Sequence, residues 1–279
     1  MKITHWTVAL IATVLLSSGG WAKGRFAPLE PGARYVAMGS SFAAGPGVTT
    51  SADTPPTRCG RSTDNYAQLL ARKRGFTLTD VSCSGATTAH ILGSWADLAP
   101  QIDAVTAETR LVTVTIGGND LQYLGNLMRS TCHPQGASRL CNTITAPTED
   151  QYRTVEAQMR AIVAETRKRA PAARLVFVDY LTILPGRGSC AAADTNPSAA
   201  DINRDLAARL VAITARVARN TGTEVLAASR LSRRHDACSR TPWISGFPEG
   251  KRPAGTAPYH PNLAGMTAIA KALDQLLGG

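Results

Sequence analysis

The chain has 279 residues, a formal net charge of +10 and an aromatic content of 5%. This length is sufficient for one large domain with a sizeable core. Aromatic residues are scarce and do not alternate with the basic ones, so the sequence gives little support to nucleic-acid binding. Basic residues gather at Arg230, Arg233, Arg234 and Arg240. A basic surface favours anionic partners such as phospholipid head groups or cell-wall polymers.

Residues 1–22 have the organisation of a secretory signal peptide. A short polar start that contains Lys2 precedes an apolar run from Val8 to Leu16. Small residues then occupy the −3 and −1 positions of a cleavage site after Ala22. An uncleaved membrane anchor is the alternative. We expect an exported protein whose mature part, residues 23–279, is one domain.

Six cysteines lie in the mature part, and an even number in an exported chain predicts three disulfides. Six cysteines allow 15 pairings, and the sequence does not choose among them. The simplest pairing is sequential: Cys59–Cys83, Cys132–Cys141 and Cys190–Cys238. A zinc site is the rival interpretation, but the chain has no C-x-x-C pair.

Apolar runs rich in β-branched residues alternate with amphipathic segments along the mature chain. In chain order, strands are expected at Arg34–Met38, Thr77–Val81, Leu111–Ile116, Leu175–Tyr180 and Glu224–Ala228. Helices are expected at Asp64–Arg74, Gln101–Glu108, Gln151–Arg169, Ala199–Asn220 and Asn262–Leu277. This alternation predicts an α/β fold with a parallel sheet covered on both faces. Four long connections are interpreted as cleft-forming loops fixed by the disulfides: Gly45–Arg61, Arg129–Pro147, Leu184–Pro197 and Arg230–Ala257.

Residues suited to acyl transfer follow three consecutive strands. Ser41 comes after the first strand, Gly85 after the second and Asn119 after the third. Ligands of open parallel sheets bind beyond the carboxyl ends of the strands, so these residues should meet at one rim. There Ser41 would be a nucleophile. The backbone N–H groups of Ser41 and Gly85 and the side-chain amide of Asn119 would be donors to an oxyanion.

A serine nucleophile needs a base that is neutral near pH 7, which points to histidine. His5 belongs to the signal peptide, His90 lies in a helical segment, and His133 and His235 are next to cysteines. His260 precedes Pro261 at the start of the final helix, which gives it a fixed position. The spacing alone does not show that His260 lies close to Ser41, because that depends on the fold.

Four blocks resemble the SGNH hydrolase superfamily, also called GDSL esterases and lipases. They are Gly39-Ser40-Ser41, Gly85, Gly118-Asn119-Asp120 and His260, in the order of the family. The resemblance implies Ser41 as nucleophile, His260 as base, and Ser41, Gly85 and Asn119 as oxyanion donors. It also implies a three-layer α/β/α sandwich with a flavodoxin-like, parallel five-stranded sheet. The signal peptide and six cysteines resemble the secreted bacterial branch, whose disulfides pair sequentially.

Two positions depart from the family pattern. Ser40 replaces the aspartate that usually precedes the nucleophile, and Ala257 stands where the family has its acid, three residues before the histidine. Because some relatives orient the histidine with a backbone carbonyl, we expect the carbonyl of Ala257 to serve here. A remote carboxylate, Asp179 or Asp236, is the alternative.

The sequence thus predicts a secreted serine esterase or lipase that hydrolyses carboxylic esters, with a lipid, phospholipid or acylated glycan as substrate. The alternatives are a carbohydrate acetylesterase and a catalytically silent module that binds glycan or lipid on the same fold. No motif in the sequence indicates a metal or nucleotide cofactor. We expect a monomer.

Overall fold

The computed structural model describes residues 27–135, 138–251 and 257–278. The expected signal peptide, residues 1–22, lies outside the described residues. Within those ranges, no helix has both the length and the apolar character needed to cross a bilayer.

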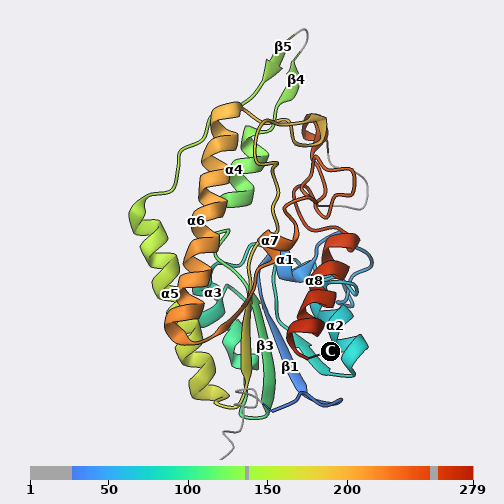
Figure 1. Cartoon of the computed structure of the whole chain (residues 1–279), viewed down its shortest axis with the longest axis vertical. Helices are drawn as coiled ribbons and strands as arrows, with labels where there is room; N and C mark the ends of the chain where they lie inside the picture. The colour runs from blue at the N-terminus through green and yellow to red at the C-terminus, as the bar shows by residue number, and fades with distance from the viewer. Residues whose placement is uncertain (1–26, 136–137, 252–256, 279) are drawn as a thin grey trace, which may run out of the picture.

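A five-stranded parallel sheet forms the centre of the molecule (Figure 1). Its order is β2-β1-β3-β6-β7, which is the expected flavodoxin-like order. The strands are β1 (Arg34–Gly39), β2 (Thr77–Asp80), β3 (Thr109–Thr115), β6 (Arg174–Val178) and β7 (Glu224–Leu226). Residues 35–39 of β1 and 111–115 of β3 are buried, as expected for strands covered on both faces.

Helices cover both faces of the sheet, which confirms the α/β fold. Helices α2 (Tyr66–Arg74) and α8 (Leu263–Leu276) pack together on one side, and α5 (Glu149–Arg169) packs against α6 (Pro197–Thr221) on the other (Figure 1). Lys73 Nζ lies 2.6 Å from Asp274 Oδ2, so an ion pair joins α2 to α8. The shorter helices are α1 (Ser41–Ala44), α3 (Thr88–Leu92), α4 (Tyr123–Ser130) and α7 (Ala228–Leu231).

Side-chain caps begin the long helices. Thr148 and Gln151 form the capping box expected at the start of α5. Asn65, Asn196 and Asn262 accept backbone N–H groups at the starts of α2, α6 and α8. The cap at Asn262 matters for the site because it fixes the first turn of α8 two residues after His260.

The structure departs from the expected elements at several points. The segment Gln101–Glu108 contains only a short 3₁₀ helix, η1 (Gln101–Ala104). The side chain of Gln101, at its start, binds the backbone of Gly39 at the end of β1. The loop Arg129–Pro147 contains a hairpin of β4 (His133–Gln135) and β5 (Ser138–Leu140). Two further 3₁₀ turns, η2 (Ala191–Ala193) and η3 (Pro248–Gly250), were not expected either.

Three disulfides connect the loops: Cys59–Cys83, Cys132–Cys141 and Cys190–Cys238. This is the sequential pairing. Cys59–Cys83 joins the loop that follows α1 to the loop that follows β2, so it links two segments at the carboxyl edge of the sheet.

Candidate active site

Ser41 and His260 meet at the carboxyl edge of the sheet although 219 residues separate them. Ser41 Oγ lies 2.7 Å from His260 Nε2. Both residues are buried, with exposed fractions of 6% and 9%. This distance is within hydrogen-bond reach, as a nucleophile and its general base require.

The end of β1 holds Ser41 in place. Gly39 has a φ of +138°, and a side chain there would meet the Thr115 carbonyl at 2.4 Å, so the chain can turn here only with glycine. The side chain of the buried Gln101 makes two hydrogen bonds to the backbone of Gly39. Its Oε1 accepts the Gly39 N–H at 2.7 Å, and its Nε2 donates to the Gly39 carbonyl at 3.0 Å. The ring of Phe42 then packs 5.4 Å from the ring of His260.

The carbonyl of Pro258, not that of Ala257, orients His260. His260 Nδ1 lies 2.7 Å from the Pro258 oxygen, whereas the Ala257 carbonyl accepts the backbone N–H of His260. The Ala257 oxygen is thus used to close a turn and points at the backbone rather than at the ring. A carbonyl only accepts, so the Nδ1 facing it carries the proton. Nε2 is then left with a lone pair directed at Ser41.

Tyr259 holds this turn in an unusual conformation. Its φ of +58° lies in the left-handed region that non-glycine residues rarely adopt. The side chain is fully buried, and its hydroxyl lies 2.7 Å from Thr131 Oγ1. Its backbone N–H donates to the Ser245 carbonyl. These contacts hold the turn that directs the Pro258 carbonyl at the imidazole, and no sequence pattern predicts them.

The two remote carboxylates are bonded elsewhere. Both oxygens of Asp179 accept from Ser229, one from its N–H and the other from its hydroxyl. Asp236 Oδ1 accepts the backbone N–H of Cys238. These contacts do not support either carboxylate as the partner of His260.

Gly85 and Asn119 line the same cleft as Ser41 and His260, a cavity of about 500 Å³. One N–H of the Asn119 side chain donates to the Ala86 carbonyl at 2.9 Å, which fixes the amide plane. An amide nitrogen carries two donors, so the second N–H is available to a ligand. Gly85 has a φ of +89°, and a side chain there would meet the ring of Trp95 at 3.0 Å. The loop therefore requires glycine at this position.

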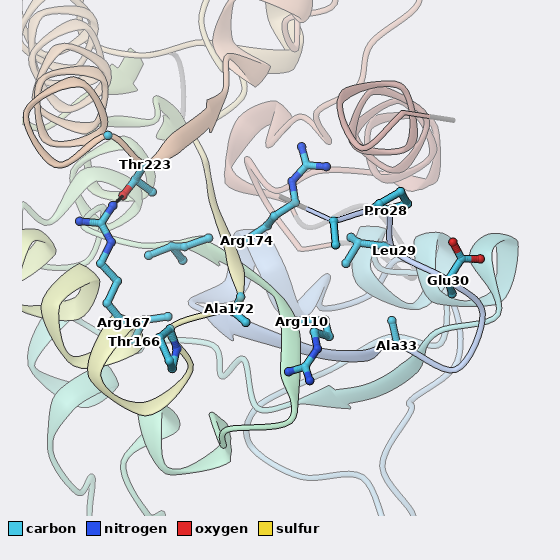
Figure 2. A pocket seen from close by; sticks show the side chains of 15 residues that line it. Pro28, Leu29, Glu30, Ala33, Arg110, Thr166, Arg167, Ala172, Arg174 and Thr223 are labelled. Carbon is cyan, nitrogen blue, oxygen red and sulfur yellow. Dashed lines mark hydrogen bonds between the residues drawn. The ribbon is translucent and has the colours of Figure 1, made fainter. Parts of the chain in front are cut away.

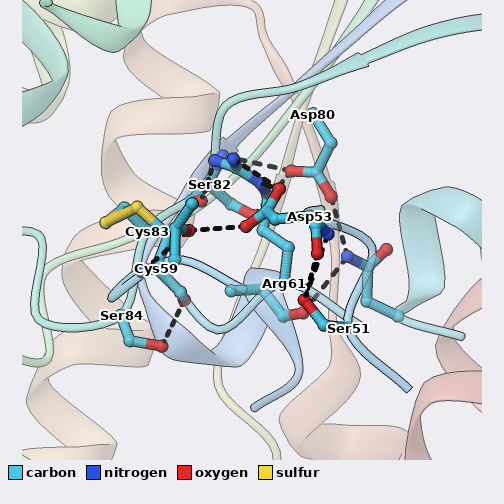
Figure 3. Close-up of polar contacts among 11 residues, drawn as sticks. Ser51, Asp53, Cys59, Arg61, Asp80, Ser82, Cys83 and Ser84 are labelled. Atoms are coloured by element: carbon cyan, nitrogen blue, oxygen red, sulfur yellow. Dashed lines mark hydrogen bonds and ion pairs between the residues drawn. A yellow bond between two sulfur atoms is a disulfide. The ribbon is translucent and has the colours of Figure 1, made fainter. Parts of the chain in front are cut away.

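A polar network behind Gly85 holds its loop against the loop that follows α1 (Figure 3). Arg61 binds the Asp53 carboxylate through two nitrogens and donates to the Ser82 carbonyl. Ser84 Oγ donates to the Cys59 carbonyl at 2.7 Å. Together with the Cys59–Cys83 disulfide, these bonds give the N–H of Gly85 a rigid support.

Ser40, which stands where the family usually has aspartate, takes part in a buried chain of hydrogen bonds. Its hydroxyl lies 3.2 Å from the hydroxyl of Tyr180, which accepts the Gly118 N–H at 2.9 Å. Burial raises the pKa of Tyr180 to about 12, so the phenol stays protonated. Tyr180 thereby connects the Ser40-Ser41 turn to the Gly118-Asn119 turn. Asp120 accepts the N–H of Thr88 at the start of α3, which is a capping role.

The other histidines of the described chain stack on aromatic rings. His90 lies parallel to Trp95 with ring centroids 4.4 Å apart, and burial lowers its pKa. His235 stacks on Trp243 at 4.1 Å. His133 packs edge-on against Phe247. Among the histidines that the structure describes, His260 is the one whose ring is hydrogen-bonded to a serine hydroxyl.

A larger cavity, about 720 Å³, lies at the opposite, amino edge of the sheet (Figure 2). Its side chains include Arg110, Arg167 and Arg174, and no serine, cysteine or histidine is among the described residues that line it. Arg174 pairs with Glu224, and Arg167 donates to the Thr221 carbonyl. The described lining of this cavity therefore lacks a serine–histidine pair like the one in the cleft at Ser41.

Comparisons with known proteins show a family and a fold for the chain. Residues 37–268 match the model of the GDSL-like lipase/acylhydrolase family. The chain is 34% identical to "Lipase 2" of Streptomyces coelicolor over 293 aligned positions, covering 99% of this chain and 97% of the relative. The crystal structure of an extracellular lipase from Streptomyces rimosus superposes with a TM-score of 0.69, at 24% identity over 87% of this chain and 98% of that one. A phospholipase A1 from Streptomyces albidoflavus gives a TM-score of 0.67, at 23% identity over 88% and 99%.

Proposed function

The chain belongs to the GDSL-like lipase/acylhydrolase family, and we propose that it is a secreted serine esterase that cleaves carboxylic esters through an acyl-enzyme on Ser41. The observation that carries this proposal is the 2.7 Å contact of Ser41 Oγ with His260 Nε2, together with the Pro258 carbonyl on Nδ1. This pair of contacts leaves the basic nitrogen facing the hydroxyl.

In the proposed mechanism, Nε2 of His260 accepts the hydroxyl proton while Ser41 Oγ attacks the ester carbonyl. The carbonyl oxygen becomes an oxyanion, which the N–H groups of Ser41 and Gly85 and the free N–H of Asn119 stabilise. The imidazolium then gives its proton to the leaving alcohol, and the acyl group stays on Ser41. Water activated by His260 attacks this acyl-enzyme and releases the acid, so that the serine is restored.

The Pro258 carbonyl fixes the ring without supplying a full negative charge. It holds the correct tautomer, but it stabilises the imidazolium less than a carboxylate would. A silent binding module is the alternative that the missing acid at position 257 suggests. The contact between Nδ1 and Pro258 supports an oriented ring instead, so we favour hydrolysis.

Export, the substrate class and the monomeric state are part of the proposal. Three disulfides are typical of exported proteins. The substrate is an acyl ester of a lipid, a phospholipid or an acylated glycan, and a carbohydrate acetylesterase would use the same site. Hydrolysis of short nitrophenyl esters, triglyceride, phosphatidylcholine and acetylated xylan would separate these substrates. Light scattering would test the monomer.

Covalent labelling with a fluorophosphonate tests the nucleophile directly. We expect the protein to be labelled and to lose its esterase activity, and the Ser41→Ala variant to remain unlabelled. Mass spectrometry of the labelled peptide should place the phosphonyl group on Ser41. A label on any other residue would refute the assignment, and no label at all would favour the binding module.

A further inference from the structure

Four exposed arginines gather on α7 and the turn after it: Arg230, Arg233, Arg234 and Arg240. Within the described residues, no ion pair or side-chain hydrogen bond is found for any of them. Arginines elsewhere are often paired; Arg61 binds Asp53 and Arg216 binds Glu156. We call these four residues together with Leu231 the basic face. Because none of these four arginines is paired with a carboxylate in the described part of the chain, the basic face attracts anions.

The basic face also has an apolar component. Leu231 lies between Arg230 and Arg233 in the sequence and is 46% exposed. Arg233 lines a cavity of about 580 Å³, whose other walls include the apolar side chains of Leu181, Leu184 and Val211. An anionic lipid surface offers phosphates to the arginines and acyl chains to the exposed leucine and the apolar cavity.

This face lies on the same edge of the molecule as the catalytic cleft. α7 directly follows β7, just as Ser41 follows β1, and both strands end at the carboxyl edge of the sheet (Figure 1). β7 is three strand positions from β1, which corresponds to roughly 14 Å. Two other exposed apolar residues mark this edge: Met128 on the cleft wall and Leu263 at the start of α8, near His260.

We propose that the basic face binds the anionic surface of a phospholipid bilayer and so brings the cleft of Ser41 to the membrane. The arginines interact with lipid phosphates, and Leu231 enters the boundary between head groups and acyl chains. Leu231 and the apolar cavity favour a bilayer, because its acyl chains can contact both of them. A nucleic acid would bind the arginines but would offer Leu231 and the cavity no apolar partner. This binding does not depend on the proposed hydrolysis.

Co-sedimentation with vesicles tests this proposal, with Ser41→Ala protein so that no lipid is consumed. The probes are vesicles of phosphatidylglycerol with phosphatidylcholine, and vesicles of phosphatidylcholine alone. The test variant is Arg230→Gln/Arg233→Gln/Arg234→Gln. Its matched control is Arg34→Gln/Arg110→Gln/Arg219→Gln, which removes the same charge from exposed arginines at the amino edge of the sheet.

We expect binding to the anionic vesicles that weakens from 0.1 M to 1 M salt. The test variant should lose roughly 100-fold in partitioning, because each arginine near an anionic surface contributes about fivefold. Leu231→Ser should lower partitioning roughly fivefold. The control variant should show only a small part of the decrease that the test variant shows. Equal losses in the two triple variants would overturn the proposal, as would equal binding to the neutral vesicles. Tighter binding to short duplex DNA than to anionic vesicles would also overturn it. Far-UV circular dichroism and urea unfolding of the triple variants report their folding independently of any hydrolysis.

Discussion

Asp179, directly after β6, should make the stability of the protein depend on pH. Burial raises its pKa from 3.8 to about 6, although hydrogen bonds from Ser229 favour the carboxylate. The folded protein therefore holds this proton more tightly than the unfolded chain does. The stabilising contribution is complete below pH 3.8 and is lost as the pH rises through about 6. A pKa difference of about 2 corresponds to about 3 kcal/mol of unfolding free energy.

The variant Asp179→Asn removes this titration and keeps a similar shape. Its amide can accept the Ser229 N–H and donate to the Ser229 hydroxyl. Urea unfolding with the disulfides intact should show that, between pH 4 and pH 8, the variant gains about 2 to 3 kcal/mol relative to the wild type. A pH dependence that is the same in both proteins within about 0.5 kcal/mol would refute the reasoning.

The same variant tests whether Asp179 takes part in catalysis. Its oxygens bind Ser229, while Nδ1 of His260 faces the Pro258 carbonyl, so we expect kcat at pH 7 to stay within about twofold of the wild type. Loss of the carboxylate that orients a catalytic histidine typically costs about 10⁴ in kcat. A fall of more than about 100-fold would therefore reinstate Asp179 as the partner of His260.

Three further variants test the oxyanion donors and their support. Asn119→Ala removes one donor and should lower kcat about 10² to 10³-fold; steady-state kinetics showing less than about a threefold change would exclude Asn119 from the site. Gly85→Ala places a side chain against the ring of Trp95 at a positive φ, so it should lower both thermal stability and kcat. Its control is Gly32→Ala, where φ is +84° and the space is open, and this variant should lower stability alone. Replacing both Cys59 and Cys83 by alanine opens a loop with a sequence separation of 24 and should lower the unfolding free energy by up to about 3.5 kcal/mol. If urea unfolding showed no loss for this double variant, the loop-closure argument would fail.

The central strands and the residues at their ends could be predicted because they depend on local pattern. Runs rich in apolar and β-branched residues predicted all five strands of the sheet, although the edge strand β2 is only partly buried. The polar residues that follow β1, β2 and β3 were placed at one edge by the expected topology. The strand boundaries differed by at most two residues, since the ends of strands depend on pairing rather than on composition.

The contacts that orient the site could not be predicted, because they depend on tertiary packing. The shift from the Ala257 to the Pro258 carbonyl follows from the left-handed Tyr259, whose side chain is held by Thr131, 128 residues away. Gln101 was expected in a helix, yet its buried amide binds Gly39 across 62 residues. Neither contact has a spacing signal, since each joins segments that are distant along the chain.

The ion pair of Lys73 with Asp274 has a practical consequence for assays. Asn262 caps α8 two residues after His260, and α2 packs against α8. If His260 is the base, as we propose, heating that loosens this one pair of helices would displace its ring and abolish ester hydrolysis while most of the far-UV circular dichroism signal persists. Inactivation would then precede the spectroscopic melting transition, and the gap between the two temperatures would measure how firmly α8 is docked.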